Sequence, residues 1–345
     1  MATKKTDLVK HARECMRGIE NETIPSFTPD FSHLDEEGIR LDVQQAIRHG
    51  FFCTLAVTEA GLTFEESKRF LEIVVDEAKG KILVSAPVTF DSLDKNVEFL
   101  KHLQKIGAHT CLLGYPPSYC PKSVEQAYQD YRDMCDAVPD FPIVLYPTHK
   151  FNFERFHPSG FPLDLLDQWA DIPNVVAAKV SIIEPGWIFE CFRRLNEKIV
   201  VGCPMERWAP LLHEQFGMHW MGAGHYEAFQ SPEKPYLVDY FNLLLQGKTD
   251  QGMEIFWKLT PVRIMFEKQF LATLELGTYH WPQHKYYQWL VGGNGGFTRQ
   301  PVMKMYQHEM EETKAAMRAI GLNLREPDEE FFFGRVNYAK MKKAF

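Results

Sequence analysis

The sequence has no apolar run that reaches the roughly 18 residues of a membrane-spanning helix. It also has no run of basic residues: 38 Lys and Arg stand against 46 Asp and Glu, which gives a formal net charge of −8. Nucleic-acid-binding proteins usually carry a basic patch. The start of the chain, MATKKTDLVKHAREC, lacks the apolar segment of a secretory signal. The sequence therefore predicts neither a membrane nor a nucleic acid as partner.

Cysteine is sparse and scattered, with seven residues and no CxxC pair. An odd number without paired spacing argues against a disulfide framework and a structural zinc site, and it favours a cytoplasmic location. No HExxH or HxH motif occurs, although His213, His219 and His225 lie near one predicted strand end. The GGNGGF stretch at 292–297 lacks the GK[ST] ending of a phosphate loop, so we interpret it as a turn. We expect no metal and no cofactor.

What the sequence does contain is a regular alternation of short apolar runs and longer amphipathic runs. The apolar runs are continuous, as is typical of parallel strands that are covered on both faces. We predict strands at 23–27, 51–57, 82–88, 109–113, 143–146, 175–180, 199–202 and 219–223. We predict helices between them at 34–49, 63–79, 92–106, 124–137 and 163–170.

This pattern predicts an α/β fold, a (β/α)8 TIM barrel with a helical C-terminal extension. Eight strand–helix units in about 230 residues fit the usual size of such a barrel, roughly 250 residues. After Pro232 the strand signal is lost, and helices are predicted at 236–245, 248–277 and 303–321. We therefore expect a barrel over 1–232, including an N-terminal helical lead-in, and a helical region over 233–345.

Two reactive residues stand at predicted strand ends. Tyr146 closes the run IVLY, and Lys179 lies in the apolar run VVAAKV. The active sites of such barrels lie at the carboxyl ends of the strands. A buried lysine favours its neutral amine, which Schiff-base chemistry requires. The alternative is a structural lysine at the strand rim that pairs with a carboxylate such as Glu206.

Several segments, in order, resemble the N-acetylneuraminate lyase and dihydrodipicolinate synthase superfamily of class I Schiff-base aldolases. The resemblance is carried by TP at 28–29, LDEEG at 34–38, GAH at 107–109, YPPSY at 115–119, FPIVLY at 141–146, IPNVVAAK at 172–179 and GGNGGF with RxP at 292–301. The segments LGYP at 113–116, YRD at 131–133, AVP at 137–139 and KFNF at 150–153 resemble the hydratase-aldolase subgroup.

The resemblance implies roles for individual residues. Lys179 would form the Schiff base, Tyr146 would act as general acid and base, and Tyr119 would complete a proton relay. The family's Thr-Thr pair after the second strand is replaced by Ala56 and Val57.

The substrate carboxylate would then be held by the segment that also contains Thr58 and Glu59. We also expect Gly222 and His225, at the end of the last predicted strand, to line the pocket. The aromatic loop after Tyr146 is expected to favour a bulky or aromatic substrate.

These residues predict a lyase that forms a Schiff base with a 2-oxo acid and makes or breaks the adjacent C–C bond, with an aldehyde as the second substrate. One alternative is hydration or dehydration of a 2-keto-3-deoxy acid without C–C cleavage. A second alternative is a barrel that binds a carboxylate or sugar acid without turnover. We expect a homo-oligomer, either a dimer or a tetramer.

Overall fold

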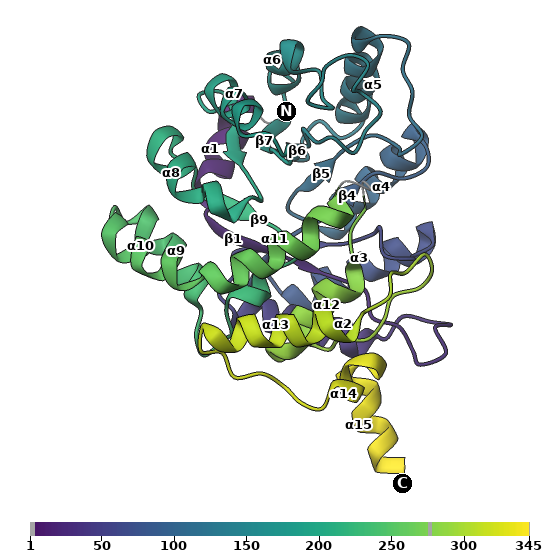
Figure 1. Cartoon of the computed structure of the whole chain (residues 1–345). Coiled ribbons are helices and arrows are strands. Elements are labelled where there is room, and N and C mark those ends of the chain that lie inside the picture. Colours follow the sequence, from purple (N-terminus) through teal and green to yellow (C-terminus); the bar gives the residue numbers. More distant parts are fainter. Residues whose placement is uncertain (1–3, 275–277, 345) are drawn as a thin grey trace. The chain divides into compact units, whose positions relative to one another are not determined.

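The computed structural model describes residues 4–274 and 278–344, and it alternates short buried strands with helices as the sequence predicts (Figure 1). The strands are β1 Gly18–Thr23, β2 Cys53–Ala56, β3 Leu83–Ser85, β4 Pro87–Val88, β5 Cys111–Leu113, β6 Ile143–Leu145, β7 Val175–Lys179, β8 Val200–Gly202 and β9 Trp220–Gly222. Only Ala86 separates β3 from β4. Seven of the eight predicted strands are thus confirmed, with ends that differ by a few residues.

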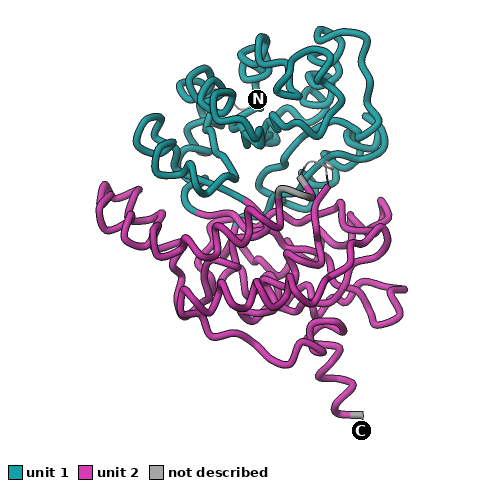
Figure 2. The backbone as a smooth tube through the Cα atoms, viewed as in Figure 1, with its two compact units in different colours: residues 1–18, 83–222 teal, residues 19–82, 223–345 magenta. Residues whose placement is uncertain are grey.

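The chain forms two compact units that interleave along the sequence (Figure 2). The first unit contains residues 1–18 and 83–222, and the second contains residues 19–82 and 223–345. The division at residue 232 that the sequence suggests stays a prediction.

The first unit contains a parallel sheet in the order β4-β5-β6-β7-β8. Its helices are α1 Lys5–Cys15, α4 Leu93–Ile106, α5 Val124–Asp136, η1 Leu163–Leu165, α6 Leu166–Ala170, α7 Pro185–Leu195, η2 Glu206–Trp208 and α8 Ala209–Phe216. Serine caps start two of them, because Ser92 accepts from the Lys95 amide and Ser123 accepts from the Gln126 amide.

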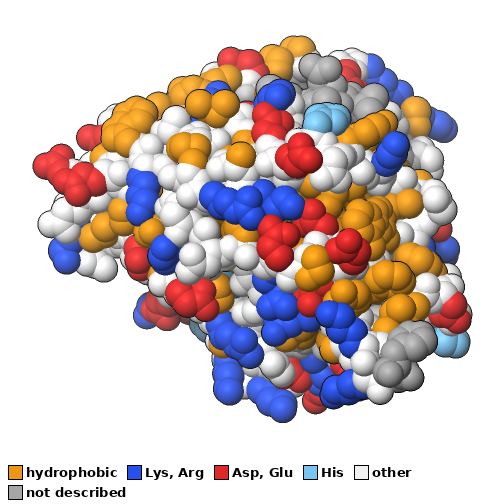
Figure 3. Space-filling view, turned by 60° about the horizontal axis from the view of Figure 1, so that its bottom comes forward, with side chains coloured by type: hydrophobic (Ala, Val, Ile, Leu, Met, Phe, Trp, Pro, Cys, Tyr) orange, Lys and Arg blue, Asp and Glu red, His pale blue; other side chains and the backbone are white. Residues whose placement is uncertain are grey.

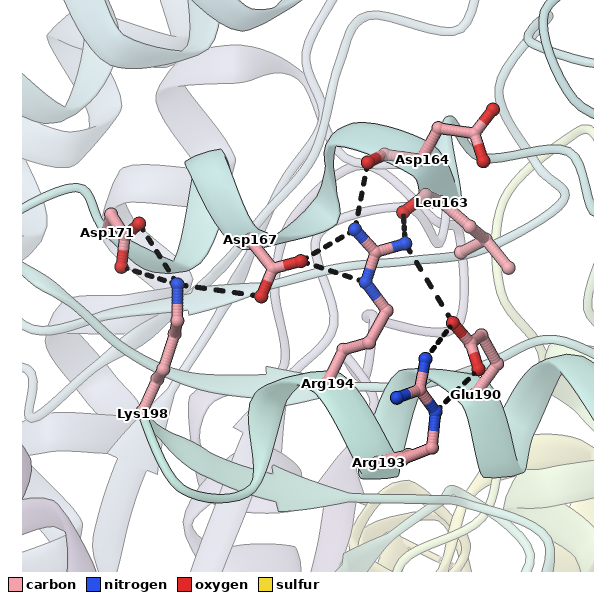
Figure 4. A network of polar contacts seen from close by, with 8 residues as sticks. All are labelled: Leu163, Asp164, Asp167, Asp171, Glu190, Arg193, Arg194 and Lys198. Carbon is pink, nitrogen blue, oxygen red and sulfur yellow. Dashed lines mark hydrogen bonds and ion pairs between the residues drawn. The ribbon is translucent and has the colours of Figure 1, made fainter.

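A network of ion pairs joins the two helices on either side of β7 (Figure 4). Arg194 on α7 donates to Asp167 on α6 from Nε at 2.8 Å and from Nη2 at 2.6 Å. Its guanidinium also donates to the carbonyl oxygens of Leu163 and Asp164 in η1. Lys198 extends the network to Asp171 at 2.9 Å. These contacts fix the helices that precede and follow the strand bearing Lys179.

The helix α1 is anchored to the beginning of β7. The Nζ atom of Lys5 donates to the carbonyl oxygens of Ala170, Ile172 and Val175 at 2.5, 2.6 and 3.0 Å. Burial lowers the pKa of Lys5 to about 8, although the nearby Asp171 opposes this shift. The sequence predicts a helical lead-in here. The anchoring role of Lys5 could not be predicted from the sequence.

The second unit contains the parallel pair β1–β2 and the C-terminal helices. Its helices are α2 Glu36–Arg48, α3 Phe64–Ala78, η3 Tyr226–Phe229, α9 Tyr236–Leu245, α10 Thr249–Lys258, α11 Thr260–Leu274, α12 Trp281–Leu290, α13 Gln307–Ala319, α14 Asp328–Phe333 and α15 Arg335–Ala344. The helix α3 begins with a capping box, since the Thr63 amide donates to Glu66 at 3.0 Å and the Glu66 amide donates to the Thr63 hydroxyl at 3.2 Å. The last three residues of the helix predicted at 248–277, residues 275–277, lie outside the described residues.

The predicted position of the first strand is wrong. The sequence suggested residues 23–27, whereas β1 is Gly18–Thr23, with the sequence GIENET. All six of its residues are buried although three of them are Glu20, Asn21 and Glu22. These polar residues do not fit the apolar pattern of a covered strand. Two of them face the C-terminal part of the chain: Asn21 donates to Glu227, and Glu22 lies 3.8 Å from the His284 imidazole.

Candidate active site

Lys179 and Tyr146 lie side by side in the first unit. Lys179 is the last residue of β7, and Tyr146 directly follows β6. The parallel register pairs Leu145 with Ala178, and a further bridge pairs Thr148 with Ser181. The same register places Tyr146 beside Lys179, so their side chains leave the same face of the sheet. Their exposed fractions are 4% for Lys179 and 5% for Tyr146.

The next strand leaves room beside the lysine. Lys179 is paired with Gly202 on β8, and the Val180 amide donates to the Gly202 carbonyl at 2.8 Å. A Cβ atom at position 202 would lie 2.4 Å from the indole of Trp220 on β9. Glycine is therefore required for this indole to pack on the face that carries Lys179. This contact could not be predicted from the sequence.

Cys203, which follows β8, does not add a nucleophile to this site. Burial raises the pKa of its thiol to about 12, although the positive charge of Lys179 opposes this shift. A thiol with this pKa stays protonated at neutral pH and is a weak nucleophile. Cys203 is therefore a buried thiol beside the lysine, whereas Cys120 is exposed. The alternative partner of the lysine, Glu206, is buried as well.

The aromatic loop after Tyr146 packs around its own core. Phe151 contacts Tyr146 edge to face, with ring centroids 6.1 Å apart. It also contacts Tyr115 at 5.6 Å, and Phe153 contacts Tyr115 at 5.0 Å. Phe161 contacts Trp169 at 5.7 Å. Of these phenylalanines, Phe151 is therefore the one in ring contact with Tyr146, while Phe153 and Phe161 belong to the core of the loop.

Tyr119 is held by an acidic side chain of the same unit. Its ring stacks on Tyr115 with centroids 4.8 Å apart, and its hydroxyl donates to Asp130 on α5. Burial and the hydrogen bond to the Asp130 carboxylate raise the pKa of Tyr119 above its usual value. Its role in a proton relay stays a prediction.

The predicted carboxylate-binding segment lies in the second unit, at the end of β2. Ala56 closes the strand, and Val57 packs with Ile24 and Trp281. The Val57 amide donates to the Thr23 carbonyl at 2.9 Å, so this amide is already used. Thr58 and Glu59 follow; Thr58 is buried and Glu59 is exposed. Their role in substrate binding stays a prediction.

The two residues predicted to line the pocket belong to different units. Gly222 is the last residue of β9 in the first unit, whereas His225 precedes η3 in the second. The His225 imidazole is buried and stacks on Phe266, with ring centroids 3.4 Å apart. Sequence reasoning did not anticipate this stacking partner from α11.

The second unit also contains a buried polar cluster that sequence reasoning missed. Asn21 Nδ2 donates to Glu227 Oε1 at 2.7 Å, and Gln288 Nε2 on α12 donates to the Glu22 carbonyl at 2.7 Å. Burial raises the pKa of Glu227 to about 8, and the nearby negative charges of Glu22 and Asp42 add to this shift. A carboxyl with this pKa is mostly protonated at neutral pH.

A buried lysine completes this cluster. Lys285 on α12 donates to the Pro25 carbonyl and the Ser26 hydroxyl, both at 2.9 Å. Burial lowers its pKa to about 8, although Asp42 and Asp35 oppose the shift. The sequence signal for this cluster is indirect: both GIENET and WPQHKYYQWL place polar residues where a core element has apolar ones.

No group of three His, Cys, Asp or Glu side chains within residues 4–274 and 278–344 could hold a metal ion. Over the same ranges, no helix has the length and apolar character needed to span a bilayer.

Comparisons with known proteins identify a family and similar structures. The model of the dihydrodipicolinate synthetase family matches residues 30–202, half of the chain. A 4-hydroxy-tetrahydrodipicolinate synthase from Thermus thermophilus is 26% identical over 190 residues, 53% of this chain and 62% of that protein. A trans-o-hydroxybenzylidenepyruvate hydratase-aldolase from Sphingobium xenophagum is 32% identical over 121 residues, 35% of each chain. The chain thus matches less than two thirds of the length of these curated relatives.

The crystal structure of N-acetylneuraminate lyase from Fusobacterium nucleatum has a TM-score of 0.71 to this chain at 17% identity. The likeness covers 92% of this chain and 99% of that one. It confirms the predicted fold class, a (β/α)8 barrel with a helical C-terminal extension. Since the family model matches half of the sequence, including both segments that carry Tyr146 and Lys179, the chain belongs to the dihydrodipicolinate synthetase family.

Proposed function

We propose that this protein is an enzyme, a class I aldolase or lyase whose Lys179 forms a Schiff base with a 2-oxo acid. The observation that carries the proposal is the position of Lys179 beside Tyr146 at the carboxyl ends of two neighbouring parallel strands, both side chains being buried. In barrels of this kind the active site is built at these strand ends. The family match supports this reaction class.

In the cleavage direction, the neutral amine of Lys179 attacks the C2 carbonyl carbon of a 4-hydroxy-2-oxo acid, and water leaves to give an iminium. The iminium withdraws electrons from the C3–C4 bond. Loss of the C4 hydroxyl proton then breaks this bond, releases an aldehyde and leaves an enamine on the lysine. Protonation at C3 and hydrolysis release the shortened 2-oxo acid and restore the amine.

Tyr146 is the proposed general acid and base for these proton transfers. It is placed in register with Lys179, and edge-to-face packing on Phe151 restrains its ring. The substrate carboxylate is assigned to the segment Ala56, Val57, Thr58 and Glu59 by the family resemblance. Because that segment lacks two hydroxyls, its hold on the carboxylate is expected to be weaker than in relatives with the Thr-Thr pair.

The aldehyde partner is proposed to be bulky or aromatic. The hydratase-aldolase relative is named for an aromatic substrate, trans-o-hydroxybenzylidenepyruvate, and its 32% identity supports this assignment. Phe151 and Trp220 supply aromatic surface next to Tyr146 and Lys179. The same relative favours a second candidate reaction, in which water adds to the unsaturated Schiff base without a following C–C cleavage.

A release assay tests the proposal. The full-length protein is incubated with a panel of 4-hydroxy-2-oxo acids, and the freed 2-oxo acid is measured by its NADH-dependent reduction. We expect release by the unaltered chain, no release by Lys179→Ala, and normal release by Lys101→Ala, which changes an exposed lysine of α4. Equal release by Lys179→Ala would refute the Schiff-base assignment. Hydration of an arylidene pyruvate without aldehyde release would favour the second candidate.

A further inference from the structure

A cavity of about 450 Å³ lies within the second unit, lined by residues that the proposed reaction does not use. This volume is in the range of small-molecule sites. Three arginines line it: Arg48 at the end of α2, Arg325 in the segment before α14, and Arg335 at the start of α15. Among the described residues that line the cavity, the one acidic side chain is Glu233. The lining is therefore basic in a chain whose net charge is negative.

Two of the three guanidinium groups are held in place. Arg335 Nη1 donates to the Gly292 carbonyl at 2.8 Å, and Gln45 Nε2 donates to the same carbonyl at 2.6 Å. Arg325 donates to Glu330 from Nε at 3.0 Å and pairs with it through Nη2 at 2.8 Å. Arginine that is held in this way keeps free N–H groups in a fixed fork, which suits a carboxylate or a phosphate.

Arg48 differs from the other two arginines. It is exposed, and within the described part of the chain its side chain has neither a hydrogen bond nor an ion pair. Burial lowers the pKa of Arg335, and the positive charges of Arg325 and Arg48 lower it further, while the negative charges of Glu330 and Asp42 oppose the shift. The three arginines therefore lie within electrostatic range of one another, and an anion in the cavity would offset positive charge that Glu330 and Asp42 do not already balance.

The cavity also has an apolar wall, formed by Leu290, Val291, Leu324 and Pro232. Figure 3 shows one face of the molecule, on which basic, acidic and hydrophobic side chains are interspersed. An inorganic ion would leave this wall unused. A small organic anion could place its charged group on the arginines and its hydrocarbon part against the wall.

We propose that this cavity is a second ligand site, which binds a small organic anion through a carboxylate or phosphate group on Arg48, Arg325 and Arg335. It is separate from Lys179 and Tyr146, which belong to the first unit. The proposal therefore does not depend on the aldolase assignment.

The test is a calorimetric titration of the full-length protein with four probes: phenyl phosphate, benzoate, inorganic phosphate and phenol. We expect phenyl phosphate or benzoate to bind more tightly than inorganic phosphate or phenol, and the affinity to fall as salt is added. The comparison of phenyl phosphate with benzoate identifies the preferred anionic group. Weak ligands are expected to bind at concentrations up to about 10 mM. If none of the four probes binds at this concentration, the proposal is overturned.

Variants locate the site. Arg48→Gln should weaken the binding of the preferred probe by about tenfold or more, about 1.4 kcal/mol, and Arg48→Lys should restore part of it because the charge returns without the fork. Arg17→Gln, which removes an exposed arginine of the first unit, should leave binding unchanged. Lys179→Ala should also leave it unchanged, which excludes binding at the proposed Schiff-base site. Binding that survives Arg48→Gln, or is lost in Arg17→Gln or Lys179→Ala, would contradict the assignment.

Discussion

Replacing Glu227 by glutamine should make the stability of the protein less dependent on pH. The Glu227 side chain is fully buried, and its Oε1 atom accepts from Asn21 at 2.7 Å and from Gln288 at 3.4 Å. Its Oε2 atom has no hydrogen-bond partner among the described residues. Glutamine resembles the protonated acid in shape and charge, so Glu227→Gln should fit the same space.

The size of the effect follows from the pKa of Glu227, which burial raises from 4.5 to about 8. Below pH 4.5 the carboxyl is protonated in both the folded and the unfolded chain. In that range the contribution of Glu227 to the free energy of unfolding has its full value and does not change with pH. Between pH 4.5 and 8 the unfolded chain has lost the proton while the folded chain keeps it. The free energy of unfolding should therefore fall by up to about 1.4 kcal/mol per pH unit, or about 5 kcal/mol over this range.

Urea unfolding at pH 5, 6, 7 and 8 measures this slope. Glu227→Gln should show a less negative slope than the unaltered chain and be the more stable protein at pH 8, because other titrating groups, such as the buried His49 whose pKa burial lowers to about 3, act on both proteins alike. Glu254→Gln, which changes an exposed glutamate of α10, should follow the unaltered chain. If Glu227→Gln and the unaltered chain have the same slope, Glu227 is ionised in the folded protein and the reasoning is refuted.

Three further predictions concern the site in the first unit. Tyr146→Phe should keep the fold and some Schiff base but lose about 10²- to 10⁴-fold in turnover, and near-normal turnover would reduce Tyr146 to a packing residue. Gly202→Ala should cost about 1–3 kcal/mol in urea unfolding, because its Cβ would lie 2.4 Å from the Trp220 indole, and unchanged stability would contradict this packing. In a comparison of cleavage rates, an aryl aldol substrate should exceed 2-keto-3-deoxy sugar acids and N-acetylneuraminate, and the reverse order would contradict the proposed aromatic partner.

Much of the fold could be predicted because parallel strands that are covered on both faces are apolar without interruption. The runs that contain β6 and β7 have this character, and their structural bounds lie within one residue of the predicted ones. The strand β1 could not be predicted in this way, because it carries buried polar residues, and a hydrogen-bond partner of such a residue can lie more than 200 positions away. The contact between Asn21 and Glu227 is one example.

The neighbouring positions of Tyr146 and Lys179 also followed from the sequence, since two successive parallel strands place their carboxyl ends together. The contacts that surround these two residues could not be predicted from the sequence. The approach of Trp220 to Gly202 depends on the packing of β8 against β9, and the hydrogen bond from Tyr119 to Asp130 depends on the position of α5. Such contacts are set by side-chain packing between elements, which the pattern of a single sequence does not encode.

Borohydride trapping tests the central claim most directly. The full-length protein is mixed with 2-oxo acids such as pyruvate, reduced with borohydride, and examined by intact mass and peptide mapping. The account predicts one covalent adduct, on Lys179, that is absent in Lys179→Ala. Lys5 and Lys285 are internal controls, because burial lowers the pKa of each to about 8 and makes their amines more reactive as well. An adduct on either of these lysines in place of Lys179, or no adduct with any 2-oxo acid tested, would contradict the claim.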